Sequence, residues 1–117
     1  MYLFRFFYEI LNCPYLNPSW ITWYPSQGPF AFRLLNPNKI STLWGMMKNN
    51  PRMNYEKMSR AIRFGKQSGH FEYKINTKGR KENFVFSFGK KSLDILNLTQ
   101  PEKKLKAIEC AYQKLLE

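Results

Sequence analysis

The stretch that decides the fold spans residues 48 to 63 and reads KNNPRMNYEKMSRAIR. Asn49-Asn50-Pro51 is typical of a turn that stops one helix, and the remainder predicts a second helix that begins near Met53 and Asn54. Steps of three and four residues return to the same face of a helix. The expected core side carries Tyr55, Met58, Ala61 and Ile62. The opposite side carries Lys57, Arg60, Arg63 and Phe64, and we expect Gly65 and Gly69 to close the helix.

A helix is also predicted on the N-terminal side of this turn. Asn36 has the properties of an N-cap, and Pro37 suits the first helical position. Apolar side chains then recur on one face until Asn49-Asn50-Pro51 stops the helix: Ile40, Leu43, Trp44 and Met47. Two helices joined by a tight, proline-containing turn predict a helix-turn-helix.

The elements further out on both sides predict a mixed fold. Residues 2–12 have helical spacing, with an apolar side of Leu3, Phe6, Phe7, Ile10 and Leu11 and a polar side of Arg5, Glu9 and Asn12. Short aromatic and β-branched runs at 20–24 and 30–35 predict one hairpin, and alternating runs at 71–75 and 83–88 predict a second with a basic tip. The expected fold class is α+β: a winged helix-turn-helix with three helices on a small four-stranded antiparallel sheet, plus an extra C-terminal helix.

The extra helix is expected near the C-terminus. Thr99, followed three residues later by Glu102, forms a capping box. An apolar stripe runs from there to the end of the chain through Leu105, Ile108, Tyr112 and Leu115. This stripe predicts packing against the rest of the domain, with a surface for a protein partner as the alternative.

Charge is concentrated in the middle of the chain. The 117 residues contain 19 Lys+Arg and 8 Asp+Glu, a formal charge of +11. Residues 48–91 hold twelve basic and three acidic residues, whereas residues 92–117 hold four of each. A folded block with a net charge of +9 indicates a polyanionic partner, nucleic acid first and acidic lipid second.

Several function classes are excluded by composition. A single His, a single Asp and two cysteines 97 positions apart give no basis for a metal site, a thiol nucleophile or an enzyme, and no cofactor is expected. The apolar N-terminal run is interrupted by Arg5 and Glu9, which suits neither a signal sequence nor a membrane span. We therefore expect a soluble protein that binds without catalysis, with unlinked cysteines in a reducing compartment.

The predicted helix-turn-helix indicates which basic residues read bases and which contact phosphates. Its second helix lies in the major groove of B-DNA, where arginine donates bidentately to guanine O6 and N7, so Arg60 and Arg63 are the expected base readers. Seven further basic residues lie outside the apolar stripes and are expected to meet phosphates: Lys48, Arg52, Lys57, Lys66, Lys78, Arg80 and Lys81.

Four segments carry a family resemblance: LFRFFYEIL at 3–11, Trp44-Gly45, residues 48–63 and FVFSF at 84–88. In order and spacing they resemble the ETS-family DNA-binding domain over about residues 2–89, which leaves 90–117 as a C-terminal extension. The resemblance implies a winged helix-turn-helix, double-stranded DNA as ligand, and a GGA core read by Arg60 and Arg63. It also implies phosphate contacts from the backbone amide near Leu3, from Trp44, Lys48 and Tyr55, and from the wing.

The function expected on these grounds is that of a monomeric, nuclear transcription factor that regulates RNA polymerase II transcription. Two departures from the family pattern, Met46-Met47 and Phe64-Gly65-Lys66, remove basic and tyrosine side chains, and residues 65–69 weakly resemble the Spi subgroup. The alternative function is therefore a protein-interaction, competitor or repressor module with degraded DNA specificity. RNA is disfavoured, because a recognition helix cannot enter the deep, narrow major groove of A-form RNA.

Overall fold

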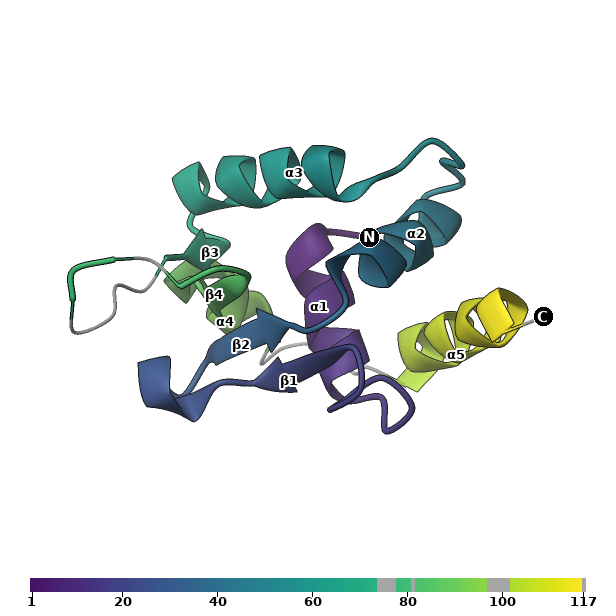
Figure 1. Ribbon diagram of the computed structural model, residues 1–117, viewed down its shortest axis with the longest axis horizontal. Coiled ribbons are helices and arrows are strands. Elements are labelled where there is room, and N and C mark those ends of the chain that lie inside the picture. The colour runs from purple at the N-terminus through teal and green to yellow at the C-terminus, as the bar shows by residue number, and fades with distance from the viewer. Residues whose placement is uncertain (74–77, 81, 97–101, 117) are drawn as a thin grey trace.

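The computed structural model describes residues 1–73, 78–80, 82–96 and 102–116 (Figure 1). Within these residues the helices are α1 (Leu3–Leu11), α2 (Pro37–Met47), α3 (Tyr55–Gln67), α4 (Lys90–Leu96) and α5 (Glu102–Leu116), with a short 3-10 turn, η1, at Pro25–Gln27. The strands are β1 (Ile21–Trp23), β2 (Ala31–Leu34), β3 (Phe71–Glu72) and β4 (Val85–Phe88). The winged helix-turn-helix expected from the sequence is confirmed.

The four strands form one antiparallel sheet in the order β1-β2-β4-β3. Ile21 pairs with Leu34 in the first hairpin, and Phe71 pairs with Phe88 in the second. The two hairpins join where Phe32 of β2 pairs with Phe86 of β4. Both predicted hairpins are therefore present, with strands shorter than the sequence runs that predicted them.

Helix α1 lies at the centre of the molecule (Figure 1). The Phe7 ring contacts Phe32 of β2 at 5.3 Å and Phe71 of β3 at 5.7 Å between centroids. The polar side predicted for this helix is wrong at two positions, because Arg5 and Glu9 are both buried and form an ion pair at 3.4 Å. The reason is tertiary: α3, α4, α5 and the sheet surround α1, so no side of it stays open except at the ends.

Helix α3 rests on Met58 and Ile62, which are both fully buried. Two details of the sequence prediction were wrong. Ala61 is exposed, because the core side of the helix is narrower than the predicted stripe. The helix also continues through Gly65 to Gln67. A Cβ at Gly65 would come within 2.6 Å of the Phe71 ring, so glycine serves close packing there and does not end the helix.

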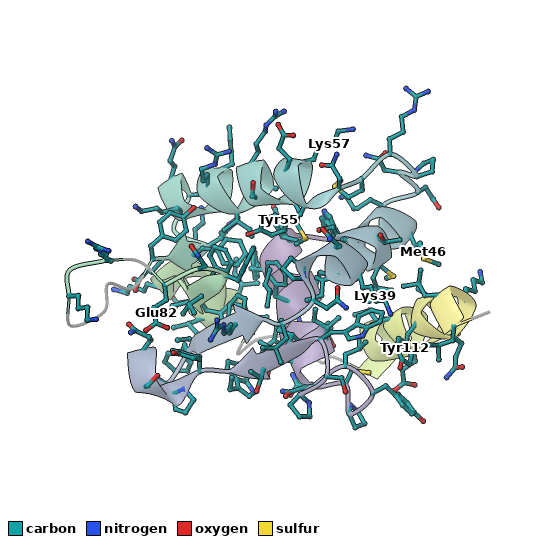
Figure 2. All side chains as sticks on the ribbon, in the orientation of Figure 1. Lys39, Met46, Tyr55, Lys57, Glu82 and Tyr112 are labelled. Carbon is teal, nitrogen blue, oxygen red and sulfur yellow. The ribbon has the colours of Figure 1, made fainter. Side chains whose placement is uncertain are left out.

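Two helices follow the sheet. The sequence did not predict α4, a short helix that packs against α1. Helix α5 packs on α2 and α1, with Ile108 fully buried and the Tyr112 ring 5.2 Å from that of Trp20 (Figure 2 labels Tyr112). The structure therefore shows intramolecular packing for the apolar stripe of this helix, which was the first of the two roles considered for it. Thr99 and the side chains of Glu102 and Leu105 lie outside the described part.

None of the helices in the described part of the chain is long and apolar enough to cross a membrane. Among the same residues there is no group of three or more His, Cys, Asp or Glu side chains close enough to hold a metal ion. Both cysteines, buried Cys13 and exposed Cys110, are free thiols.

Replacement of Ile108 tests the packing of α5. Ile108→Ala should lower the free energy of unfolding by about 2–5 kcal/mol, because it leaves a cavity between α5 and the helices beneath it. The matched control is Gln113→Ala, at an exposed position on the same helix. This variant should change the free energy of unfolding by less than about 0.5 kcal/mol. Denaturant unfolding measures both, and equal small effects would show that α5 does not belong to the core.

Candidate nucleic-acid interface

Helix α3 presents a long exposed face along one edge of the molecule (Figure 1). The side chain of Asn54 caps its start by accepting from the Lys57 backbone N–H at 2.9 Å. Outside the buried positions, the exposed side chains of this helix are Glu56, Lys57, Arg60, Ala61, Arg63, Phe64, Lys66 and Gln67. An α-helix that is free on one side and supported on the other has the shape that fits a major groove.

The two predicted base readers lie on this exposed face. Arg60 is 63% exposed and donates to Glu56, one turn earlier, at 2.5 Å. Arg63 is exposed as well, and its charge acts on the phenol of Tyr73 at the start of the wing. Both guanidinium groups therefore point away from the core, as base reading requires.

The turn between α2 and α3 is held by its own polar groups. The Asn50 side chain accepts from the Arg52 backbone N–H at 3.1 Å, and Lys57 Nζ donates to the Arg52 carbonyl oxygen at 3.1 Å. Figure 2 shows Lys57 on the outer side of α3 beside this turn. The Lys57 ammonium group and the backbone of Arg52 thus lie together at one end of the exposed face.

A second cationic position lies where α2 meets the start of α1. Lys48 Nζ donates to the Met1 carbonyl oxygen at 3.4 Å and lies 5.3 Å from the centre of the Trp44 ring. Trp44 is buried against Phe6, at 5.0 Å between rings. Among the described side chains none caps the first turn of α1, which begins at Leu3. The fold therefore brings the predicted contacts at Leu3, Trp44 and Lys48 together.

The wing side of α3 carries a third group. Lys66 Nζ lies 4.5 Å from the centre of the Tyr73 ring, and Tyr55 packs its ring against Phe84 at 5.3 Å. Burial raises the pKa of the Tyr55 hydroxyl, and neighbouring Tyr73 raises it further. The pKa of Tyr73 is raised by burial and lowered in part by Arg63. Tyr55 therefore stays protonated at neutral pH and keeps an O–H that can donate to a phosphate.

The tip of the wing is described in part. Lys78 and Arg80 are exposed there, whereas Lys81 lies outside the described residues. At the base of the wing, the Tyr24 hydroxyl donates to a Glu82 carboxylate oxygen at 2.5 Å and so joins the first hairpin to the second. Sequence reasoning missed Tyr73 and Tyr24. Their partners lie 7 and 58 positions away, so no helical or strand periodicity indicated these contacts.

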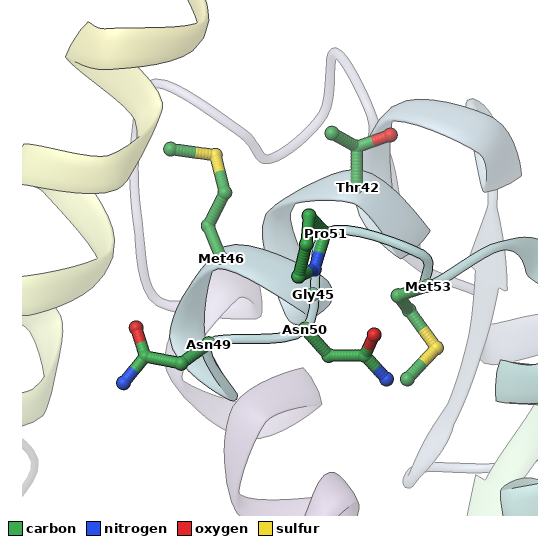
Figure 3. A pocket seen from close by; sticks show the side chains of 7 residues that line it. All are labelled: Thr42, Gly45, Met46, Asn49, Asn50, Pro51 and Met53. Atoms are coloured by element: carbon green, nitrogen blue, oxygen red, sulfur yellow. The ribbon is translucent and has the colours of Figure 1, made fainter.

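A hollow of about 550 Å³ opens between α2 and the turn (Figure 3). Its lining is apolar or uncharged: Thr42, Gly45, Met46, Asn49, Asn50, Pro51 and Met53. Figure 3 shows Met46 and Met53 on opposite sides of Gly45. None of these lining side chains is ionisable.

Fold and site together define a class: a winged helix-turn-helix with a basic recognition face. Comparison with protein families agrees, because the Ets-domain family matches residues 1–89. The chain belongs to the Ets-domain family. This membership supports DNA binding and transcription regulation as the general class of function. Membership of the Spi subgroup stays a prediction.

Several curated relatives are similar to this chain. It is 30% identical to human ETS translocation variant 4 over 112 residues, which cover 96% of this chain and 22% of that protein. It is 35% identical to human ETS domain-containing protein Elk-4 over 86 residues, 74% of this chain and 18% of that protein. It is 36% identical to mouse ETS homologous factor over 89 residues, which cover 76% of this chain and 28% of that protein. The chain thus spans less than a third of the length of each of these relatives.

The tight turn can be tested at Gly45. A Cβ there would lie 2.6 Å from the Asn50 carbonyl oxygen and 2.7 Å from Met53 Cβ. Gly45→Ala should therefore lower the free energy of unfolding by about 1–3 kcal/mol, because backbone must move to admit the methyl group. Thr42→Ala, at an exposed position of the same helix, is the control and should retain nearly full stability. Thermal unfolding distinguishes the two, and an unchanged melting temperature for Gly45→Ala would contradict the geometry of the turn.

Proposed function

We propose that this protein binds double-stranded DNA sequence-specifically at sites with a GGA core and acts as a transcription factor for RNA polymerase II. The observation that carries the proposal is the position of Arg60 and Arg63, both exposed on the outer face of α3, which rests on buried Met58 and Ile62. A guanidinium can donate to both guanine O6 and N7, an acceptor pair that no other base edge offers. Two such groups three residues apart suit neighbouring guanines.

Groups that we propose as phosphate contacts lie in three directions around the helix and suit this placement. At one end lie Arg52 and Lys57 in and beside the turn, and at the start of α1 lie the Leu3 amide, Trp44 and Lys48. On the wing side lie Tyr55, Lys66, Lys78 and Arg80, with Lys81 assigned from its sequence position. Groups on both sides of a groove-bound helix fix its register on the duplex without reading sequence.

The remaining proposals concern the whole protein. Residues 2–89 form the DNA-binding domain and residues 90–117 an extension whose described helices pack on α1 and α2. The proposed state is a monomer, the proposed location is the nucleus, and no enzymatic step is assigned to any residue. The competitor or interaction alternative depended partly on the amphipathic C-terminal helix, and Ile108 of its apolar stripe is fully buried inside this domain.

Removal of either predicted base reader tests the specificity. Arg60→Ala or Arg63→Ala should weaken binding to a GGA-containing duplex by about 1–3 kcal/mol, because a bidentate contact to guanine is lost. Binding to a scrambled duplex should weaken less than binding to the GGA duplex in each variant. Fluorescence anisotropy with both duplexes at one salt concentration measures the difference.

Equal losses on the two duplexes would mean that these arginines contact phosphate only. A wild-type protein with no preference for GGA would instead favour the competitor or interaction alternative. Competition between DNA and RNA duplexes of one sequence decides between the nucleic acids, and the proposed function requires DNA to win.

Removal of a wing charge should have a different signature. Lys78→Ala should weaken binding to all duplexes alike and make the slope of log K against log salt shallower by about 0.9, because one fewer counterion is released. Lys114→Ala, an exposed position near the end of α5, is the matched control and should leave the slope unchanged. A salt titration measures both, and a change of base preference in Lys78→Ala would refute a role limited to phosphate.

A further inference from the structure

Glu56 and Arg60 form an ion pair on the exposed face of α3. Glu56 Oε1 accepts from Arg60 Nη2 at 2.5 Å, and the two side chains remain 70% and 63% exposed. Exposed ion pairs of this spacing add little to folding stability, because water screens them. Folding stability therefore does not account for the pair. The pair does link a proposed base reader, Arg60, to an acidic side chain on the same face of α3.

The geometry of the guanidinium allows both contacts at once. Arginine carries five N–H donors in a planar fork. When one Nη group donates to Glu56, the other donors remain for guanine O6 and N7. A carboxylate one turn earlier fixes the plane of the fork before DNA arrives, which lowers the entropy lost when the base contact forms.

The charge of the pair matters as much as its geometry. Binding to any duplex, whatever its sequence, depends on positive charge placed near phosphates. Arg60 with Glu56 beside it is a neutral unit and adds little to that general attraction. Arg63 differs, because the residues three and four positions from it are Ser59, Arg60, Lys66 and Gln67, none of them acidic.

We propose that Glu56 is a positioning residue that orients the Arg60 guanidinium and cancels its charge, so that Arg60 favours the guanine of the core without favouring other duplexes. This inference rests on the proposed function. It assigns the two arginines different roles. Arg60 contributes mainly to the preference for GGA, whereas Arg63 contributes both to that preference and to the attraction between the protein and any duplex.

The experiment measures the affinity of the full chain for a GGA duplex and a scrambled duplex over a range of salt concentrations. Glu56→Gln should raise affinity for the scrambled duplex about fivefold and steepen its salt slope by up to about 0.9, because the charge of Arg60 is released. The GGA duplex should gain less than the scrambled duplex, so the ratio of the two affinities falls by up to about fivefold. Asp94→Asn, which removes an exposed acid from α4, should leave the ratio unchanged.

Combined variants identify the partner of Glu56. In an Arg60→Ala background, Glu56→Gln should no longer change the ratio, whereas in an Arg63→Ala background it should still do so. A melting temperature that stays constant in all variants shows that they are folded.

The outcomes that overturn the inference are distinct. If Glu56→Gln shifts both duplexes equally, or lowers the ratio just as much without Arg60, Glu56 acts only as a general charge and the inference is wrong while the proposed function stands. If the wild-type chain does not distinguish the duplexes at all, the proposed function fails and the inference fails with it.

Discussion

The packing of Phe7 at the centre of the molecule is the contact on which the other elements depend. Its ring meets Phe32 of β2 and Phe71 of β3, so one side chain of α1 joins two strands of the sheet. Phe71 in turn lies directly against Gly65 of α3, where no larger residue fits. The position of α3 thus depends in part on the close contact between Gly65 and Phe71 on its inner side, and its outer side stays exposed.

This arrangement explains how charges distant in the sequence form one surface. Lys48 reaches the carbonyl of Met1, and Lys66 reaches the ring of Tyr73 on the wing. A net charge of +9 in residues 48–91 is therefore spread over a turn, a helix and a hairpin rather than along a basic tail. Charges held by a folded framework can match the spacing of phosphates on both sides of a groove, which a tail cannot do reproducibly.

Much of the fold could be predicted from local signals. Asn36 and Asn54 cap their helices as their residue types indicate, and the alternating runs became hairpins. Exposure of Arg60 and Arg63 could also be predicted from helical periodicity. The errors arose where tertiary contacts override local pattern. Arg5 and Glu9 are buried because other elements pack around α1, and Gly65 lies inside a helix at a point where Phe71 occupies the space that a side chain would need. The contact of Tyr73 with Lys66 depends on how the wing folds back, which no local pattern records.

The central claim is that α3 reads a GGA core with two arginines while the surrounding charges hold phosphate. In-vitro selection from a random duplex pool, with the full chain as the binder, tests it most directly. Recovered sequences should share GGA, because only neighbouring guanines offer paired acceptors to both Arg60 and Arg63. A pool that is retained by the protein but shows no enrichment of any core sequence would contradict the claim and leave a protein that binds DNA by charge alone.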